Sequence, residues 1–171
     1  MELCFKYIKV IEKISDSTGK AVSCLVYLLL GGLTYEVFSR YLFNAPTIWA
    51  FDLTYMLFGT IFMLGAPYTL FKKGHIRTDI FYSKWSARRQ GMIDALMYLF
   101  LFFPGMIFYL IAGWDYAALS WVAREKAQFS PWSPIIYPFK TVIPVTAALL
   151  LLQGGCEFIK SVYAWKRGEW K

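Results

Sequence analysis

The chain has 171 residues, of which 58% are hydrophobic and 20% aromatic, and its formal net charge is +7. With a mean hydropathy of +0.45, a soluble protein of this length would have to hide more apolar surface than its interior can hold. The composition therefore excludes an ordinary soluble domain and indicates a membrane protein.

The first sixteen residues, MELCFKYIKVIEKISD, predict an amphipathic helix at the membrane interface. Five apolar side chains fall near one helical face: Leu3, Tyr7, Val10, Ile11 and Ile14. Three lysines fall on another face, where we expect them to meet lipid head groups: Lys6, Lys9 and Lys13. The alternative is a solvated, frayed terminus. The segment lacks a continuous apolar core and a cleavage site, so we do not expect a signal peptide.

Four long apolar runs follow, and each predicts a membrane-spanning helix. They cover about 21–38, 49–71, 92–114 and 137–159. Roughly 20 residues are needed to cross a hydrocarbon core of about 30 Å at 1.5 Å per residue. The runs are continuous, which favours helices over the alternating strands of a barrel. The predicted fold is an all-α membrane protein with one membrane domain, residues 1–171.

The basic residues predict how these spans are oriented. Four spans put both termini and the 72–91 loop on one side, and the 115–136 segment on the other. Fourteen of the 18 Lys and Arg residues lie on the first side, and the other four are Arg40, Arg124, Lys126 and Lys140. By the positive-inside rule, both termini are predicted to be cytoplasmic. In the 72–91 loop, Trp85, Arg88 and Arg89 are expected at the level of phospholipid head groups.

The middles of the four spans, near Leu29, Thr60, Phe103 and Leu149, contain no charged residue. This argues against a proton-coupled carrier, which would need a carboxylate deep in a helix. A haem anchor would need histidines within its spans, and the single histidine, His75, lies in the basic loop. No nucleic-acid fold or motif accompanies the positive charge. We expect no catalytic residue, cofactor or metal site, and read the three cysteines as small apolar side chains.

A charge cluster is predicted where the first hairpin turns. Glu36 and Arg40 have the i, i+4 spacing of an ion pair, and Asp52 opens the second span after a short turn. One arginine near two carboxylates would lock the hairpin. The alternative is that all three residues face head groups and water.

The stretch RYLFNAPTIWAFD (40–52), the following Gly-Ala pair and KKGHIRTD (72–79) resemble the small membrane subunit of tripartite ATP-independent periplasmic (TRAP) transporters, the DctQ-like small permease. The matching positions are Arg40, Asn44, Trp49, Asp52, Gly65, Ala66, His75, Ile76 and Asp79. Ser130, Pro131, Pro134 and Pro144 also resemble the proline-marked entry into the last span of that family. One departure is Asp52, where glutamate is commoner in the family.

The resemblance implies a subunit of the bacterial inner membrane that braces a large permease. It implies a periplasmic substrate-binding protein as the other partner, sodium-driven uptake of an organic acid such as a C4-dicarboxylate or sialic acid, and a periplasmic 115–136 segment. The other interpretation is a self-contained, homo-oligomeric small channel or carrier.

Overall fold

The computed structural model of the chain describes residues 2–74, 82, 84–128 and 130–170, with side chains from Lys6 onward. Over these residues the regular structure is helical, apart from one isolated antiparallel bridge between Lys126 and Ile135. Four helical stretches are long and apolar enough to cross a membrane: Lys6–Leu42, Ala50–Phe71, Ala87–Val122 and Tyr137–Arg167. The predicted all-helical class is confirmed, and each of the four predicted runs lies in a helix that is long and apolar enough to cross a membrane.

Helix α1 (Glu2–Leu42) is one continuous helix of 41 residues. Ile8, Ser15, Val22 and Glu36 are buried at multiples of seven residues, with the half-buried Leu29 between the last two. This spacing keeps one stripe of a helix against its neighbours. The sequence predicted a separate interfacial helix at about 1–16. The structure instead joins these residues to the first span, because no proline interrupts 15–22 and the buried stripe runs on through it. A helix of this length extends about 61 Å, so it projects well beyond a hydrocarbon core of about 30 Å.

The turn after α1 reverses the chain into α2 (Ala50–Phe71). Asn44 adopts a left-handed conformation, with φ of 52°, which asparagine tolerates better than most residues. The Ala45 N–H donates to the Ser39 carbonyl at 3.0 Å, and the Ser39 hydroxyl donates to the Ala45 carbonyl at 2.5 Å. This close reversal lays α2 along α1.

The third span is a composite of α4 (Ala87–Met97), the π-helical η1 (Tyr98–Phe102) and α5 (Phe103–Val122). The N–H of Phe103 donates to the Tyr98 carbonyl five residues back. Pro104 follows directly and has no N–H to donate. The π turn therefore lies where a proline would otherwise disturb a regular α-helix.

The α5–α6 connection (residues 123–136) folds back on itself before α6 (Tyr137–Arg167). Its two halves are joined by hydrogen bonds from Ala127 N–H to the Pro134 carbonyl, 2.9 Å, and from Ile136 N–H to the Glu125 carbonyl, 3.2 Å. At its other end α6 stops at Gly168, whose φ of 77° and N–H bond to the Ala164 carbonyl form a left-handed cap.

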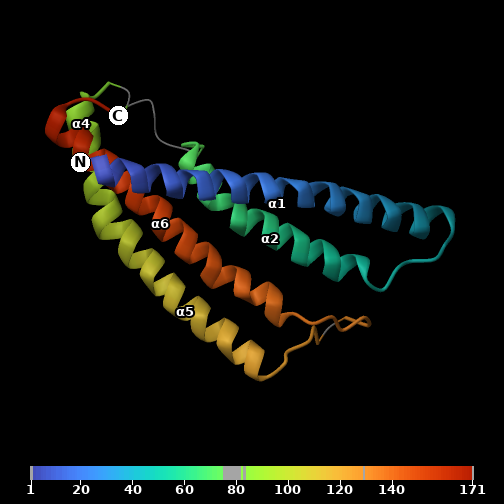
Figure 1. Ribbon diagram of the computed structural model, residues 1–171. Helices are drawn as coiled ribbons and strands as arrows, with labels where there is room; N and C mark the ends of the chain where they lie inside the picture. The colour runs from blue at the N-terminus through green and yellow to red at the C-terminus, as the bar shows by residue number, and fades with distance from the viewer. Residues whose placement is uncertain (1, 75–81, 83, 129, 171) are drawn as a thin grey trace.

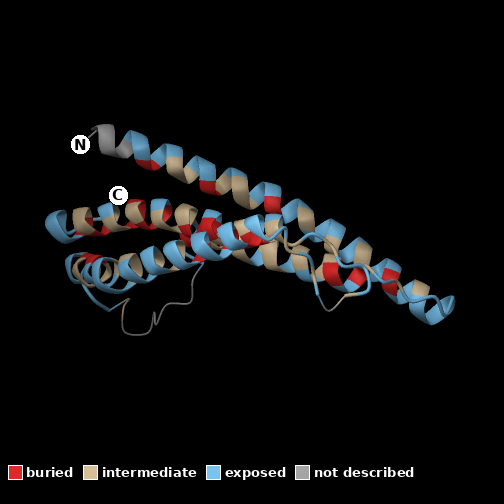
Figure 2. Cartoon of the chain, turned by 90° about the horizontal axis from the view of Figure 1, so that it is seen from below, coloured by how far each residue is buried: buried red, intermediate tan, exposed pale blue. Residues whose placement is uncertain are grey.

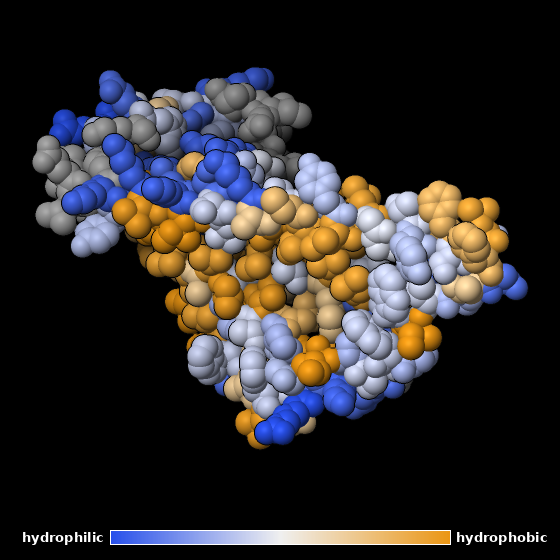
Figure 3. Space-filling view, turned by 45° about the vertical axis from the view of Figure 1, so that its right-hand side comes forward, coloured by the Kyte–Doolittle hydropathy of each residue, from blue (hydrophilic) through white to orange (hydrophobic). Residues whose placement is uncertain are grey.

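The helices form two antiparallel hairpins, α1–α2 and α5–α6, which diverge from the end of the molecule that holds both termini (Figure 1). Helix α6 is central and contacts α1, α2, α4 and α5. Buried residues follow the lines where helices meet, and the outward faces are exposed (Figure 2). On the face shown in Figure 3, a band of apolar residues separates polar residues at the two ends.

Candidate functional site

Polar side chains join the helices at both ends of the bundle. At the α1–α2 turn, Arg40 Nη2 lies 2.5 Å from Glu36 Oε1, and Arg40 Nε donates to the same oxygen at 2.9 Å. The other oxygen, Glu36 Oε2, accepts from the Thr47 N–H at 3.0 Å and from the Thr47 hydroxyl. The Glu36 side chain is 10% exposed and the Arg40 side chain 55%. The carboxylate is thus the buried centre of this cluster, and Arg40 closes it from outside.

Asp52 does not complete the predicted cluster with Arg40. It is 7% exposed, and its Oδ2 accepts a hydrogen bond from Ser130 in the α5–α6 connection. Trp49, just before α2, stacks on Tyr35 of α1 with ring centroids 5.8 Å apart. The first hairpin is therefore closed by Glu36 and by this ring pair, while Asp52 reaches the second hairpin.

A second polar contact fixes the start of α6. Lys140 Nζ lies 2.5 Å from Glu125 Oε2 and 3.9 Å from the centroid of the Tyr116 ring. Glu125 follows the end of α5, outside the spanning helices. The hydrogen bond from Lys140 lowers the pKa of the Glu125 carboxyl below its ordinary value. The pair ties the α5–α6 connection to the first turn of α6.

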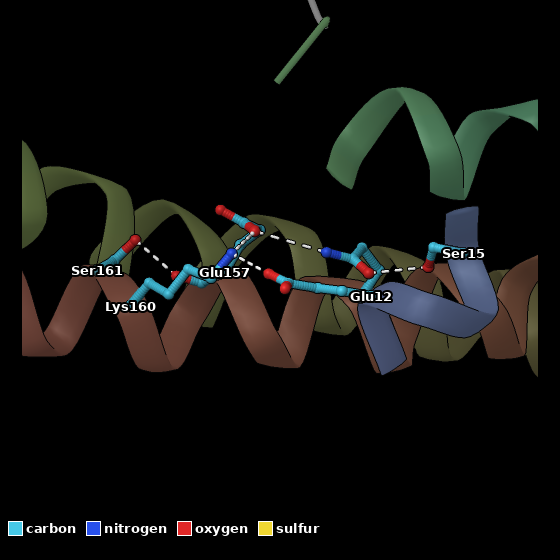
Figure 4. A network of polar contacts seen from close by, with 6 residues as sticks. Glu12, Ser15, Glu157, Lys160 and Ser161 are labelled. Atoms are coloured by element: carbon cyan, nitrogen blue, oxygen red, sulfur yellow. Dashed lines mark hydrogen bonds and ion pairs between the residues drawn. The ribbon is translucent and has the colours of Figure 1, made fainter. Parts of the chain in front are cut away.

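An extended polar network lies toward the other end of the bundle, between α1 and α6 (Figure 4). Lys160 Nζ donates to Glu12 Oε1 at 2.6 Å and to Glu157 Oε1 at 2.7 Å. Gln153 Nε2 lies 3.5 Å from the same Glu157 oxygen, and Gln153 Oε1 accepts from the Ser15 hydroxyl at 2.8 Å. Gln153 is fully buried and Glu157 is 3% exposed. The network attaches the N-terminal part of α1 to α6.

Sequence reasoning missed this network, although α6 carries a signal for it. Gln153, Glu157 and Ser161 recur every four residues and so share one face of an otherwise apolar helix. Ser15 bonds to Gln153, and Glu12 is reached through Lys160, which also binds Glu157; both α1 residues lie more than a hundred residues away in the chain. The spacing could have identified the polar face, and the fold was needed to identify what meets it.

The other predicted site residues are not brought together with these clusters by any contact that the structure describes. A side chain at Gly65 would meet no atom within 4 Å, and Asn44 serves the turn itself. The residues predicted to lie at the level of the lipid head groups are exposed: Lys6, Lys9, Lys13, Trp85, Arg88 and Arg89. His75 and Asp79 lie outside the described residues. Within the described part of the chain, no three His, Cys, Asp or Glu residues are grouped to hold a metal ion.

A family model described as the DctQ component of tripartite ATP-independent periplasmic transporters matches residues 29–163. The chain belongs to this family. A search of curated proteins gave no match. The matched range holds the Glu36–Arg40 contact, the Glu125–Lys140 contact and the α6 half of the network, and it begins after Glu12 and Ser15. DctQ proteins are the small membrane component of TRAP transporters, which also comprise a large permease and a substrate-binding protein. The chain is thus a multi-pass membrane protein of a transporter family.

Proposed function

We propose that this DctQ chain is the small scaffold subunit of a sodium-driven TRAP transporter in the bacterial inner membrane. It braces the large permease during uptake of an organic acid of the C4-dicarboxylate or sialic acid class. It carries no transport site of its own, and the solute is captured by the periplasmic binding protein. The family match over residues 29–163 carries the proposal.

The distribution of polar groups supports a bracing role. Ion and solute sites in transporters lie near the bilayer midplane, commonly at broken helices. In the described part of this chain, the buried charges of the hairpin turn and of the α5–α6 connection pair with neighbouring residues near helix ends. About 20 residues of α6 after Tyr137 cross the hydrocarbon core, which puts Glu157 and Lys160 at its other boundary. These groups hold helices together.

The outward surface supports a subunit role and lipid contact. Large apolar side chains are exposed on α1, α2 and α5, including Tyr27, Tyr41, Phe51, Phe62, Phe108 and Trp114. Such faces meet lipid or another membrane protein. At the start of α1, Tyr7 and Val10 are 65% and 53% exposed beside the exposed Lys6 and Lys9. We propose that this end of α1 contacts phospholipid head groups, with its lysines toward anionic lipid.

Reconstitution into liposomes tests the proposal. The chain alone should take up no organic acid, with or without a sodium gradient. The large permease and the binding protein together with this chain should support sodium-driven uptake, and omission of the chain should weaken or abolish it. The control omits only the binding protein. Saturable uptake by this chain alone would contradict the proposal and favour a homo-oligomeric channel or carrier.

A further inference from the structure

A pocket of about 300 Å³ lies between the first turns of α2 and the α5–α6 connection. Most of its lining surface is apolar, and the aromatic residues Phe51 and Tyr55 line it from α2. Its ionisable lining residues are Asp52, Glu125 and Lys126. The pocket therefore offers both signs of charge beside two aromatic rings.

Two of these charges have no counter-ion among the described residues. Glu125 is neutralised by Lys140. Asp52 is 7% exposed, and the donor that the structure gives it is the neutral Ser130 hydroxyl. Lys126 lines the same pocket, but no ion pair joins it to Asp52 or to another described acid. A nearly buried carboxylate is costly unless a cation meets it. The pocket thus presents a separated negative and positive group, each able to take a partner.

The position of the pocket indicates what kind of ligand can reach it. Asp52 is the third residue of a 22-residue helix that is long enough to cross a membrane. The first turn of such a helix lies at the boundary between hydrocarbon and head groups. Phe51 is 79% exposed and Tyr55 is 61% exposed. Aromatic rings at this depth pack against lipid and also attract ammonium groups through their faces.

We propose that this pocket binds the head group of phosphatidylethanolamine. The primary ammonium donates to the Asp52 carboxylate beside Phe51 and Tyr55, and the phosphate meets Lys126. The volume is at the small end for ligand sites and suits a head group whose acyl chains lie outside along α2. Phosphatidylcholine has a cation without N–H donors, and phosphatidylglycerol has no cation. The proposal rests on membrane insertion of the helices and is independent of the transport role.

Lipid binding by the full-length chain tests this site. The protein, purified in detergent and freed of lipid, is titrated with each of the three phospholipids and followed by native mass spectrometry. Phosphatidylethanolamine should bind about tenfold more tightly than either of the others, as expected for loss of a charge-assisted hydrogen bond. Asp52→Asn should remove this preference while keeping an acceptor for Ser130. Lys126→Ala should weaken the binding of all three lipids.

Matched controls are Asp115→Asn and Arg124→Ala, which change exposed charges on the same side of the bundle outside the pocket lining and should leave the preference intact. An unfolding curve for each variant shows that the fold is retained, and Lys126→Ala tests the pocket if Asp52→Asn does not fold. Equal affinities for the three lipids, or a preference that survives both pocket variants, would overturn the proposal. A second outcome would also overturn it: Asp52→Asn weakens the complex with the large permease but leaves lipid binding unchanged. Asp52 would then meet a basic side chain of the permease.

Discussion

Lys160 lies between two carboxylates from different helices, at 2.6 Å from Glu12 and 2.7 Å from Glu157. Lys160→Met would leave Glu157, which is 3% exposed, without its cation. Removing one partner of a buried pair typically costs about 3–5 kcal/mol. We expect the variant to lose that order of free energy of unfolding, measured in detergent by titration with denaturant.

The matched control is Lys20→Met. Lys20 also pairs with an acid, Asp16, but its side chain is 74% exposed, and exposed ion pairs contribute little to stability. We expect little change for this variant. Equal, small losses for Lys160→Met and Lys20→Met would mean that water or head groups replace the Lys160 contacts, and the network would not anchor α1.

Glu125 provides a pH-dependent prediction. Its pKa is lowered in the folded protein by the hydrogen bond from Lys140. A lowered folded-state pKa stabilises the fold above the unfolded value of 4.5, and that contribution is lost as the pH falls through the folded value. The melting temperature of the wild type should therefore exceed that of Glu125→Gln at neutral pH, and the difference should shrink as the pH falls below 4.5.

The control for Glu125 is Glu169→Gln, at an exposed position near the C-terminal end. Because other acids titrate over the same range, the informative quantity is the difference between each variant and the wild type at each pH. A difference for Glu125→Gln that stays constant down to the lowest pH would contradict the ion-pair interpretation.

At the scale of elements, α4 and α6 meet closely at Gly91. Among the glycines of the described residues, Gly91 lies nearest to the backbone of another helix. A Cβ atom added to Gly91 would lie 2.6 Å from the Ser161 carbonyl oxygen and 2.6 Å from the Trp165 nitrogen. Both are backbone atoms, so the helices would have to move apart. Gly91→Ala should lower the melting temperature and the yield of folded protein. Gly155→Ala is the control, since a Cβ there meets nothing within 4 Å, and it should behave like the wild type.

The four helices could be predicted from the sequence because lipid demands long apolar runs with internally satisfied backbones. Which helices pack against each other could not be predicted, because lipid tails and apolar side chains are equally apolar and helix packing therefore depends on shape. A Gly-Gly pair such as Gly31–Gly32 would permit another helix to pack closely, yet a Cβ at Gly31 would meet nothing within 4 Å. The glycines that do face α6 are Gly91 and Gly113. The i, i+4 spacing predicted the Glu36–Arg40 pair. The Asp52–Ser130 contact spans 78 residues and required the fold.

At the scale of the whole molecule, both termini lie at one end, and the α1–α2 turn and the α5–α6 connection lie toward the other (Figure 1). An even number of crossings requires this arrangement. Fourteen of the 18 Lys and Arg residues belong to the segments that the sequence assigns to the side of the termini, the 72–91 loop among them. Insertion retains basic segments on the cytoplasmic side. The fold and the charge bias are thus consistent with a single orientation.

Cysteine labelling tests this orientation. In a background without the native cysteines, Ser86→Cys and Ala123→Cys place single thiols at exposed positions beside opposite ends of the α4–η1–α5 span. A membrane-impermeant maleimide added to intact cells should label Ala123→Cys, because 14-to-4 asymmetry in basic residues holds the Ser86 end inside. Ser86→Cys should react only after the membrane is permeabilised, which also serves as the control for thiol reactivity. If Ser86→Cys were labelled from outside and Ala123→Cys were protected, the orientation would be the opposite of the predicted one. The pocket beside Asp52 would then lie in the inner leaflet.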